Sequence, residues 1–171
     1  MNFTRHLLNT SGYTHAVPTD TWNVVLYQLP AADAVSLLEM LQAHEDAKVD
    51  SHSFTAVMSA LGDAEDMPGA FKMLEKMKQL GYEPNAMTYN TLILNSGNAG
   101  ALDLAVQALE EMEERGLFPL MEVYDMLAAL AEHEGKPDMA KRFAMRRDEI
   151  QAAKEKAGGD IDAEFGLGGG P

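Results

Sequence analysis

Apolar residues recur along the chain at the spacing of one helix face, and the whole pattern then repeats. Tyr89, Leu92 and Ile93 follow i, i+3, i+4 spacing, which predicts an amphipathic helix. A second apolar stripe follows and ends at Gly116, with Pro119 beyond it. Glycine suits a left-handed helix C-cap and proline cannot continue the helix, so this block predicts a pair of antiparallel helices.

An aromatic residue near the start of each block sets the period. Counting 35 residues back from Tyr89 reaches Phe54, and counting 35 forward reaches Tyr124. A shorter step back reaches Trp22, because Pro30 ends the first helix of that block early. One helix pair cannot bury its own apolar face, whereas stacked neighbours can. We therefore expect an all-α protein, an α-solenoid of antiparallel helix pairs with about four 35-residue repeats.

This period divides the chain into six segments. We expect the last of them to be disordered, because it is rich in glycine and poor in apolar residues. The predicted segments are a partial repeat or N-terminal extension at 1–18, a short degenerate repeat at 19–50, repeats at 51–85 and 86–120, a C-terminal repeat with a long second helix at 121–157, and the Gly-rich tail at 158–171.

Composition argues against several classes of function. The chain has no cysteine, so it forms no disulfide or thiolate metal site. Its apolar runs are far shorter than the roughly 20 residues of a membrane span. The five histidines fall in different segments without partners at metal-ligand spacing, and the Ser51-His52-Ser53 run has no third orienting group. We expect no enzyme activity, cofactor, metal, membrane or small-molecule substrate.

The charge of the chain is strongly acidic. There are 27 acidic and 13 basic residues, which gives a formal net charge of −14 at pH 7. A nucleic-acid binder normally presents a basic surface, so this total opposes tight binding. Charges more than about 8 Å apart are screened at physiological salt, and the basic residues gather in the last predicted helix. Local charge therefore matters more than the total.

Four stretches of the 86–120 block resemble the pentatricopeptide repeat: Thr88–Ile93, Leu102–Ala105, Leu109–Met112 and Gly116–Pro119. The resemblance is strong for 51–120 and fair for 19–50 and 121–155. Tetratricopeptide repeats, the nearest alternative, have a different signature that is absent here. The resemblance implies a right-handed superhelix that binds single-stranded RNA, about one base per repeat, in organellar RNA processing or expression. It also implies a mitochondrial or chloroplast location, although no clear transit peptide is seen.

The resemblance further implies which residues contact bases: the residue after the aromatic, and the last residue of the repeat. The first repeat carries Asn23 with Asp50, a pair that favours uridine. The second carries Thr55 with Asn85, a pair that favours adenine. Such short polar side chains can reach the Watson–Crick edge of an unstacked base.

The last two repeats are less complete. Asn90 in the third repeat suggests a pyrimidine, but its partner position holds Leu120, which has no polar side chain. The fourth repeat has Asp125 without a terminal partner. Two complete pairs, at about 1–3 kcal/mol per stacked base, fall short of the roughly 8 kcal/mol of micromolar affinity. We expect weak RNA binding by this chain alone.

Two sets of positions depart from the family pattern. Where the family places a small aliphatic residue against the base, the chain has Asp20, His52, Met87 and Glu122. Where the family tends to place a lysine at the turn between paired helices, it has Asp63, Asn98 and His133. These departures support an alternative function, an acidic helical-repeat scaffold that binds a basic protein without direct RNA contact.

Overall fold

The structure, a computed structural model, describes residues 17–44 and 47–156. Every regular element within these ranges is an α-helix, which confirms the predicted fold class. The chain divides into two compact units between Pro84 and Asn85, and each unit is described by itself. The predicted extension at 1–18, apart from Val17 and Pro18, and the predicted tail at 158–171 lie outside the described residues.

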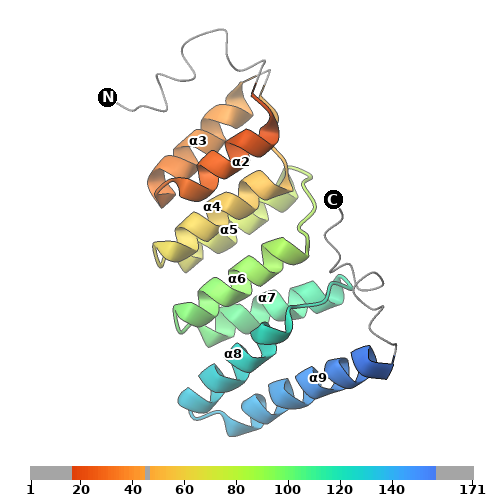
Figure 1. Ribbon diagram of the computed structural model, residues 1–171. Helices are drawn as coiled ribbons and strands as arrows, with labels where there is room; N and C mark the ends of the chain where they lie inside the picture. Colours follow the sequence, from red (N-terminus) through yellow and green to blue (C-terminus); the bar gives the residue numbers. More distant parts are fainter. Residues whose placement is uncertain (1–16, 45–46, 157–171) are drawn as a thin grey trace. The chain divides into compact units, whose positions relative to one another are not determined.

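The first unit is built around one central helix. Its four helices are α2 (Thr19–Gln28), α3 (Ala31–Ala43), α4 (Ser51–Asp63) and α5 (Met67–Gln79). Helix α4 packs against α2, α3 and α5 (Figure 1). The apolar face of α4 is buried, and the Phe54 ring lies 4.9 Å from the Tyr82 ring. As predicted, α2 ends just before Pro30, which lacks the N–H needed to extend it.

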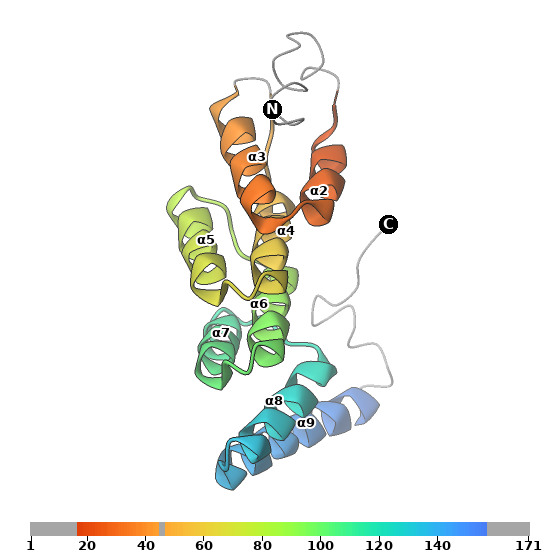
Figure 2. The ribbon, with the colours of Figure 1, turned by 90° about the vertical axis from the view of Figure 1, so that its left-hand side faces the viewer.

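The second unit comprises α6 (Ala86–Asn98), α7 (Leu102–Glu114), α8 (Met121–His133) and α9 (Pro137–Lys156). Helix α6 packs against α7 and α8, and α8 pairs with α9. Figure 2 shows α8 and α9 lying alongside each other, with α9 the longer of the two. A Cβ atom at Gly97 of α6 would meet the end of the Met126 side chain of α8. The Met126 side chain therefore occupies the space beside the glycine.

The starts of the helices follow the sequence period, and the structure identifies the cap of α6. Helices α4, α6 and α8 begin at Ser51, Ala86 and Met121, in steps of 35 residues. Thr88 has the side chain of a capping residue, but the N-cap of α6 is Asn85, whose side chain accepts the Thr88 N–H. Thr88 instead completes a capping box from the third position of the helix.

Helix α6 ends in a left-handed turn at a glycine. The helix continues through Asn95 and Ser96 to Asn98, and the chain reverses only at Gly100, whose φ is +68°. At this turn the Ala101 N–H donates to the Ser96 carbonyl at 2.8 Å, which closes the helix end as a Schellman turn.

Within the described residues, helices α4 to α8 all end in this left-handed turn, whereas α2 and α3 end in extended backbone. Glycine occupies the turn position with positive φ at residues 81, 100, 116 and 135, and the Gly116 cap was predicted. The turn between α4 and α5 differs because Glu65 takes this position with a φ of +59°. Its neighbour Asp66 still donates its N–H to the Leu61 carbonyl at 2.9 Å, so the same turn forms around a residue with a Cβ atom.

Candidate functional site

The structure joins the two base-contact residues predicted for the first repeat. Asn23 Nδ2 donates a hydrogen bond to Asp50 Oδ1 at 3.1 Å, although 27 residues separate them. The Ser53 hydroxyl donates to Asn23 Oδ1 at 2.6 Å. Asn23 is only 7% exposed, so α2 holds most of its amide inside a network that α4 completes.

Asp50 has a structural role beside its predicted functional one. It is the N-cap of α4, and its Oδ1 accepts the Ser53 N–H at 3.0 Å. Burial alone would raise the pKa of the carboxyl, but the hydrogen bonds from Ser53 and Asn23 favour the charged form and the pKa lies below its ordinary value. His52 Nδ1 lies 3.8 Å from Asp50 Oδ2, and both side chains reach solvent.

In the third repeat, the predicted base-contact residue Asn90 bonds to the backbone of Leu120, the residue at its partner position. Asn90 Oδ1 accepts the Leu120 N–H at 3.1 Å. Leu120 is the N-cap of α8 and has no side chain that could cap the helix. The acceptor of the Leu120 N–H is Asn90, whose amide nitrogen stays available as a donor.

The remaining predicted residues are engaged locally. Thr55 is 1% exposed, and its hydroxyl donates to the Ser51 carbonyl at 2.9 Å. Asn85 belongs to the second unit, where its Oδ1 accepts the Thr88 N–H at 3.0 Å. Asp125 forms an ion pair with Arg147 of α9, which also binds Asp148. These bonds occupy acceptors or donors that a base would otherwise use.

The positions that depart from the family pattern all reach solvent. Asp20, His52, Met87 and Glu122 are exposed near the starts of α2, α4, α6 and α8. Asp20 and Glu122 lie in the first turns of their helices, where a carboxylate interacts favourably with the helix dipole. Asp63, Asn98 and His133 are the exposed last residues of α4, α6 and α8, so none of these three positions holds a lysine.

One aromatic residue near the first-repeat site was missed by sequence reasoning. Tyr27 lies one helical turn after Asn23 on α2 and is 45% exposed. Partial burial and the nearby Asp50 charge both raise the pKa of its phenol, so the ring lies close to the predicted readers. The i, i+4 spacing from Asn23 was the signal that could have identified it.

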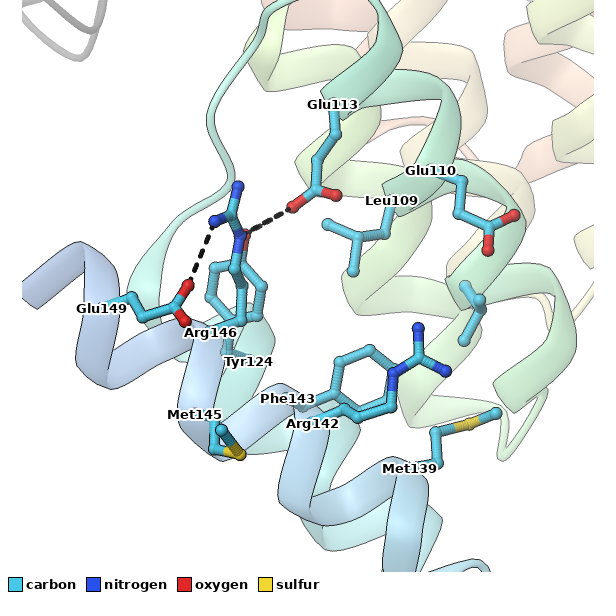
Figure 3. A pocket seen from close by; sticks show the side chains of 11 residues that line it. Leu109, Glu110, Glu113, Tyr124, Met139, Arg142, Phe143, Met145, Arg146 and Glu149 are labelled. Carbon is cyan, nitrogen blue, oxygen red and sulfur yellow. Dashed lines mark hydrogen bonds and ion pairs between the residues drawn. The ribbon is translucent and has the colours of Figure 1, made fainter.

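The second unit also has a cavity of about 480 Å³ that contains none of the predicted readers. It opens between α7, α8 and α9, and its wall mixes apolar residues, including Leu109 and Phe143, with charged ones (Figure 3). Arg146 there pairs with Glu113 and Glu149 at 3.7 and 3.3 Å. Tyr124 donates its hydroxyl to Glu113 at 2.9 Å, and burial and this bond raise the pKa of the phenol. The charges of this cavity therefore largely pair with one another.

The described residues show neither a metal-binding cluster nor a membrane-spanning helix. They contain no group of three or more histidine, aspartate or glutamate side chains placed to hold a metal ion. No helix within them combines the length and the apolar character of a membrane span.

Comparison with known repeats decides the family. Sequence models described as "PPR repeat family" and "PPR repeat" match residues 49–95 and 80–113. A pentatricopeptide repeat-containing protein of Arabidopsis thaliana is 42% identical over 69 residues. The chain belongs to the pentatricopeptide repeat family.

The pentatricopeptide relatives are much longer than this chain. The first Arabidopsis protein matches 40% of the chain and only 12% of its own length. A second pentatricopeptide repeat-containing protein of Arabidopsis thaliana, named as chloroplastic, is 30% identical over 99 residues and matches 56% of the chain and 13% of its own length. The chain thus spans about an eighth of each relative.

Solved structures share the pentatricopeptide fold. The pentatricopeptide repeat domain of Arabidopsis thaliana protein-only RNase P 1, solved in complex with tRNA, aligns with a TM-score of 0.71 at 17% identity over 96% of this chain and 89% of that domain. Maize PPR10 aligns with a TM-score of 0.64 at 24% identity over 86% of this chain and 21% of its own. PPR10 has also been solved with an 18-nucleotide psaJ RNA element. These similarities establish a helical-repeat fold.

Proposed function

We propose that this pentatricopeptide repeat segment binds single-stranded RNA, about one base per repeat, and acts as an adaptor in organellar RNA processing or expression rather than as an enzyme. The observation that carries the proposal is the Asn23–Asp50 hydrogen bond of 3.1 Å, which brings together a predicted pair that the sequence separates by 27 residues. A base above this pair would meet a carboxylate acceptor and an amide donor, the groups that read a Watson–Crick edge.

The proposed contacts extend beyond that pair. Thr55, Asn85, Asn90 and Asp125 are the other predicted readers, and Tyr27 offers an exposed ring for stacking beside the first. Base–aromatic stacking is worth about 1–3 kcal/mol per base. We assign Asp125 the weakest role, because Arg147 already pairs with it.

Affinity and location follow from the same reasoning. Few complete readers and a net charge of −14 predict weak, salt-sensitive binding by this segment, which would contribute to a longer array. The chloroplastic name of one relative supports a chloroplast, and a mitochondrial location fits the family equally well.

A second candidate function is a scaffold for a basic protein. Its support is the exposed acidity of Asp20 and Glu122 where the family packs a base, together with Asp63 where it tends to place a lysine. Carboxylates at these points repel phosphates and attract a basic surface.

A fluorescence-anisotropy titration tests the RNA proposal. Wild-type protein is titrated against a short fluorescent RNA containing U-A-U and against a scrambled RNA, at low and at physiological salt. We expect preference for U-A-U, weakening with salt, and about tenfold weaker binding by Tyr27→Ala, the change that roughly 1.4 kcal/mol of lost stacking produces. Val24→Ala, which truncates an exposed neighbour on α2, is the matched control.

Absence of binding at both salt concentrations, or equal binding of both RNAs by every variant, would contradict RNA recognition. Binding of a basic peptide in the same assay, with no binding of RNA, would favour the scaffold.

A further inference from the structure

The orientation of the Asn23 amide is set by two bonds of opposite polarity. Its Oδ1 accepts from the Ser53 hydroxyl at 2.6 Å, and its Nδ2 donates to Asp50 Oδ1 at 3.1 Å. A flipped amide would place its oxygen against the Asp50 carboxylate. Ser53 is 1% exposed, so water does not compete for its bond to Asn23.

The Ser53 hydroxyl is itself held in place by the cap of α4. Asp50 N–H donates to Ser53 Oγ at 3.1 Å, and Ser53 N–H donates to Asp50 Oδ1 at 3.0 Å. The oxygen of the hydroxyl thus already accepts a bond. Its single proton has two acceptors in reach, Asn23 Oδ1 at 2.6 Å and Asp50 Oδ1 at 3.2 Å, and the shorter contact is the one to Asn23. One residue therefore serves both the helix cap and the predicted reader.

We propose that Ser53 is a positioning residue for base recognition in the first repeat. By holding Asn23 Oδ1 toward the interior, it leaves the second Nδ2 hydrogen as the group that the amide presents to a base. A carbonyl oxygen of uracil accepts that hydrogen, whereas an exocyclic amino group of a base does not. The inference rests on the proposed RNA binding. It assigns to Ser53, which does not contact the base, control over which base Asn23 selects.

The third repeat offers an internal comparison. The residue that corresponds to Ser53, three positions after the cap of α8, is Val123, which has no hydroxyl. Asn90 Oδ1 there accepts the backbone N–H of Leu120 at 3.1 Å. The amide oxygen of the asparagine thus accepts from a side-chain hydroxyl in the first repeat and from a backbone N–H in the third. Replacing Ser53 removes the donor in the first repeat without changing the backbone.

The test compares Ser53→Ala with Ser53→Thr, which restores a hydroxyl, and with Thr88→Ala as the matched control. Thr88 is the capping-box residue of α6, and its hydroxyl donates to Asn85 at 3.1 Å, so its loss weakens a cap without touching Asn23. Each protein is titrated with the U-A-U RNA and with RNAs that carry C, A or G in place of the first U.

We expect Ser53→Ala to reduce the preference for U at the first base about fivefold, the change that corresponds to one net hydrogen bond. Ser53→Thr should retain the preference. Thr88→Ala should lower the melting temperature as Ser53→Ala does, yet keep the first-base preference. In NMR spectra without RNA, the side-chain amide signals of Asn23 should move in Ser53→Ala and stay in place in Thr88→Ala.

The outcomes separate the two proposals. RNA binding by every protein with the same first-base preference in Ser53→Ala and wild type, or unmoved Asn23 amide signals, would overturn the role of Ser53 and leave RNA binding intact. No RNA binding by wild type would overturn the proposed function and, with it, any recognition role for Ser53.

Discussion

At the scale of single residues, the described chain places side chains in more than one role at once. Asp50 and Asn85 were predicted from the family resemblance as base readers, and the structure shows both as N-caps. An acceptor that holds a helix N-terminus is fixed in position and partly occupied, so it suits a rigid contact to a base better than a flexible one. These residues therefore link the stability of a helix start to the geometry of the candidate site.

Glu65 shows the opposite case, a residue whose side chain is unfavourable at its position. Its φ of +59° is the left-handed conformation that glycine adopts at the equivalent turns. Glu65→Gly should raise the free energy of unfolding by about 0.5–1 kcal/mol, because relief of the Cβ strain exceeds the extra freedom of the unfolded chain. Urea denaturation measures this.

Gly100→Ala is the control for that experiment. No atom outside its own chain neighbours lies within 4 Å of an added Cβ there, so only the backbone conformation opposes the change. We expect it to lower the free energy of unfolding by about 1 kcal/mol. Equal stability of Glu65→Gly and wild type would show that the turn at Glu65 carries no strain.

At the scale of elements, the sequence predicted the helices better than their ends. The apolar spacing around Tyr89 and the break at Pro30 were enough to place helices, because burial of one face and loss of an N–H act locally. The cap of α6 cannot be assigned from the sequence, since Asn85 and Thr88 are both good capping residues and only the backbone shows which one lies outside the helix.

The candidate site was only partly accessible from the sequence for a related reason. The resemblance identified Asn23 and Asp50, and their contact is found. The Ser53 bond to Asn23 and the pairing of Asp125 with Arg147 join residues 30 and 22 positions apart on different helices. Such contacts depend on helix packing, which a repeat period alone does not specify.

The cap of α4 predicts a pH dependence at this scale. Because the pKa of Asp50 is lowered in the folded state, its contribution to stability is full above the ordinary value of 3.8 and is lost as the pH falls through the folded pKa. Asp50→Asn keeps the capping oxygen but cannot titrate. The stability lost between pH 7 and about pH 3 should therefore be smaller in Asp50→Asn than in wild type.

Thermal unfolding of both proteins at the two pH values measures this difference. Other carboxylates titrate equally in both and cancel in the comparison. Identical losses in wild type and Asp50→Asn would mean that the hydrogen bonds to Asp50 do not favour its charged form.

At the scale of the whole molecule, a pentatricopeptide fold is combined with an acidic composition. The fold is shown by the family matches and by structural neighbours, whereas the net charge of −14 works against phosphate binding. The proposed resolution is that base contacts supply selectivity and that a longer array supplies the missing affinity. This makes the location of RNA contacts more informative than their strength.

The most direct test of that claim is an NMR titration of the isotope-labelled protein with the U-A-U RNA, observing side-chain amide signals. The account predicts that the signals of Asn23, Asn85 and Asn90 move as RNA is added, while that of Gln107, exposed on α7, does not. A titration in which these three asparagine signals stay in place, or in which only Gln107 responds, would contradict the account.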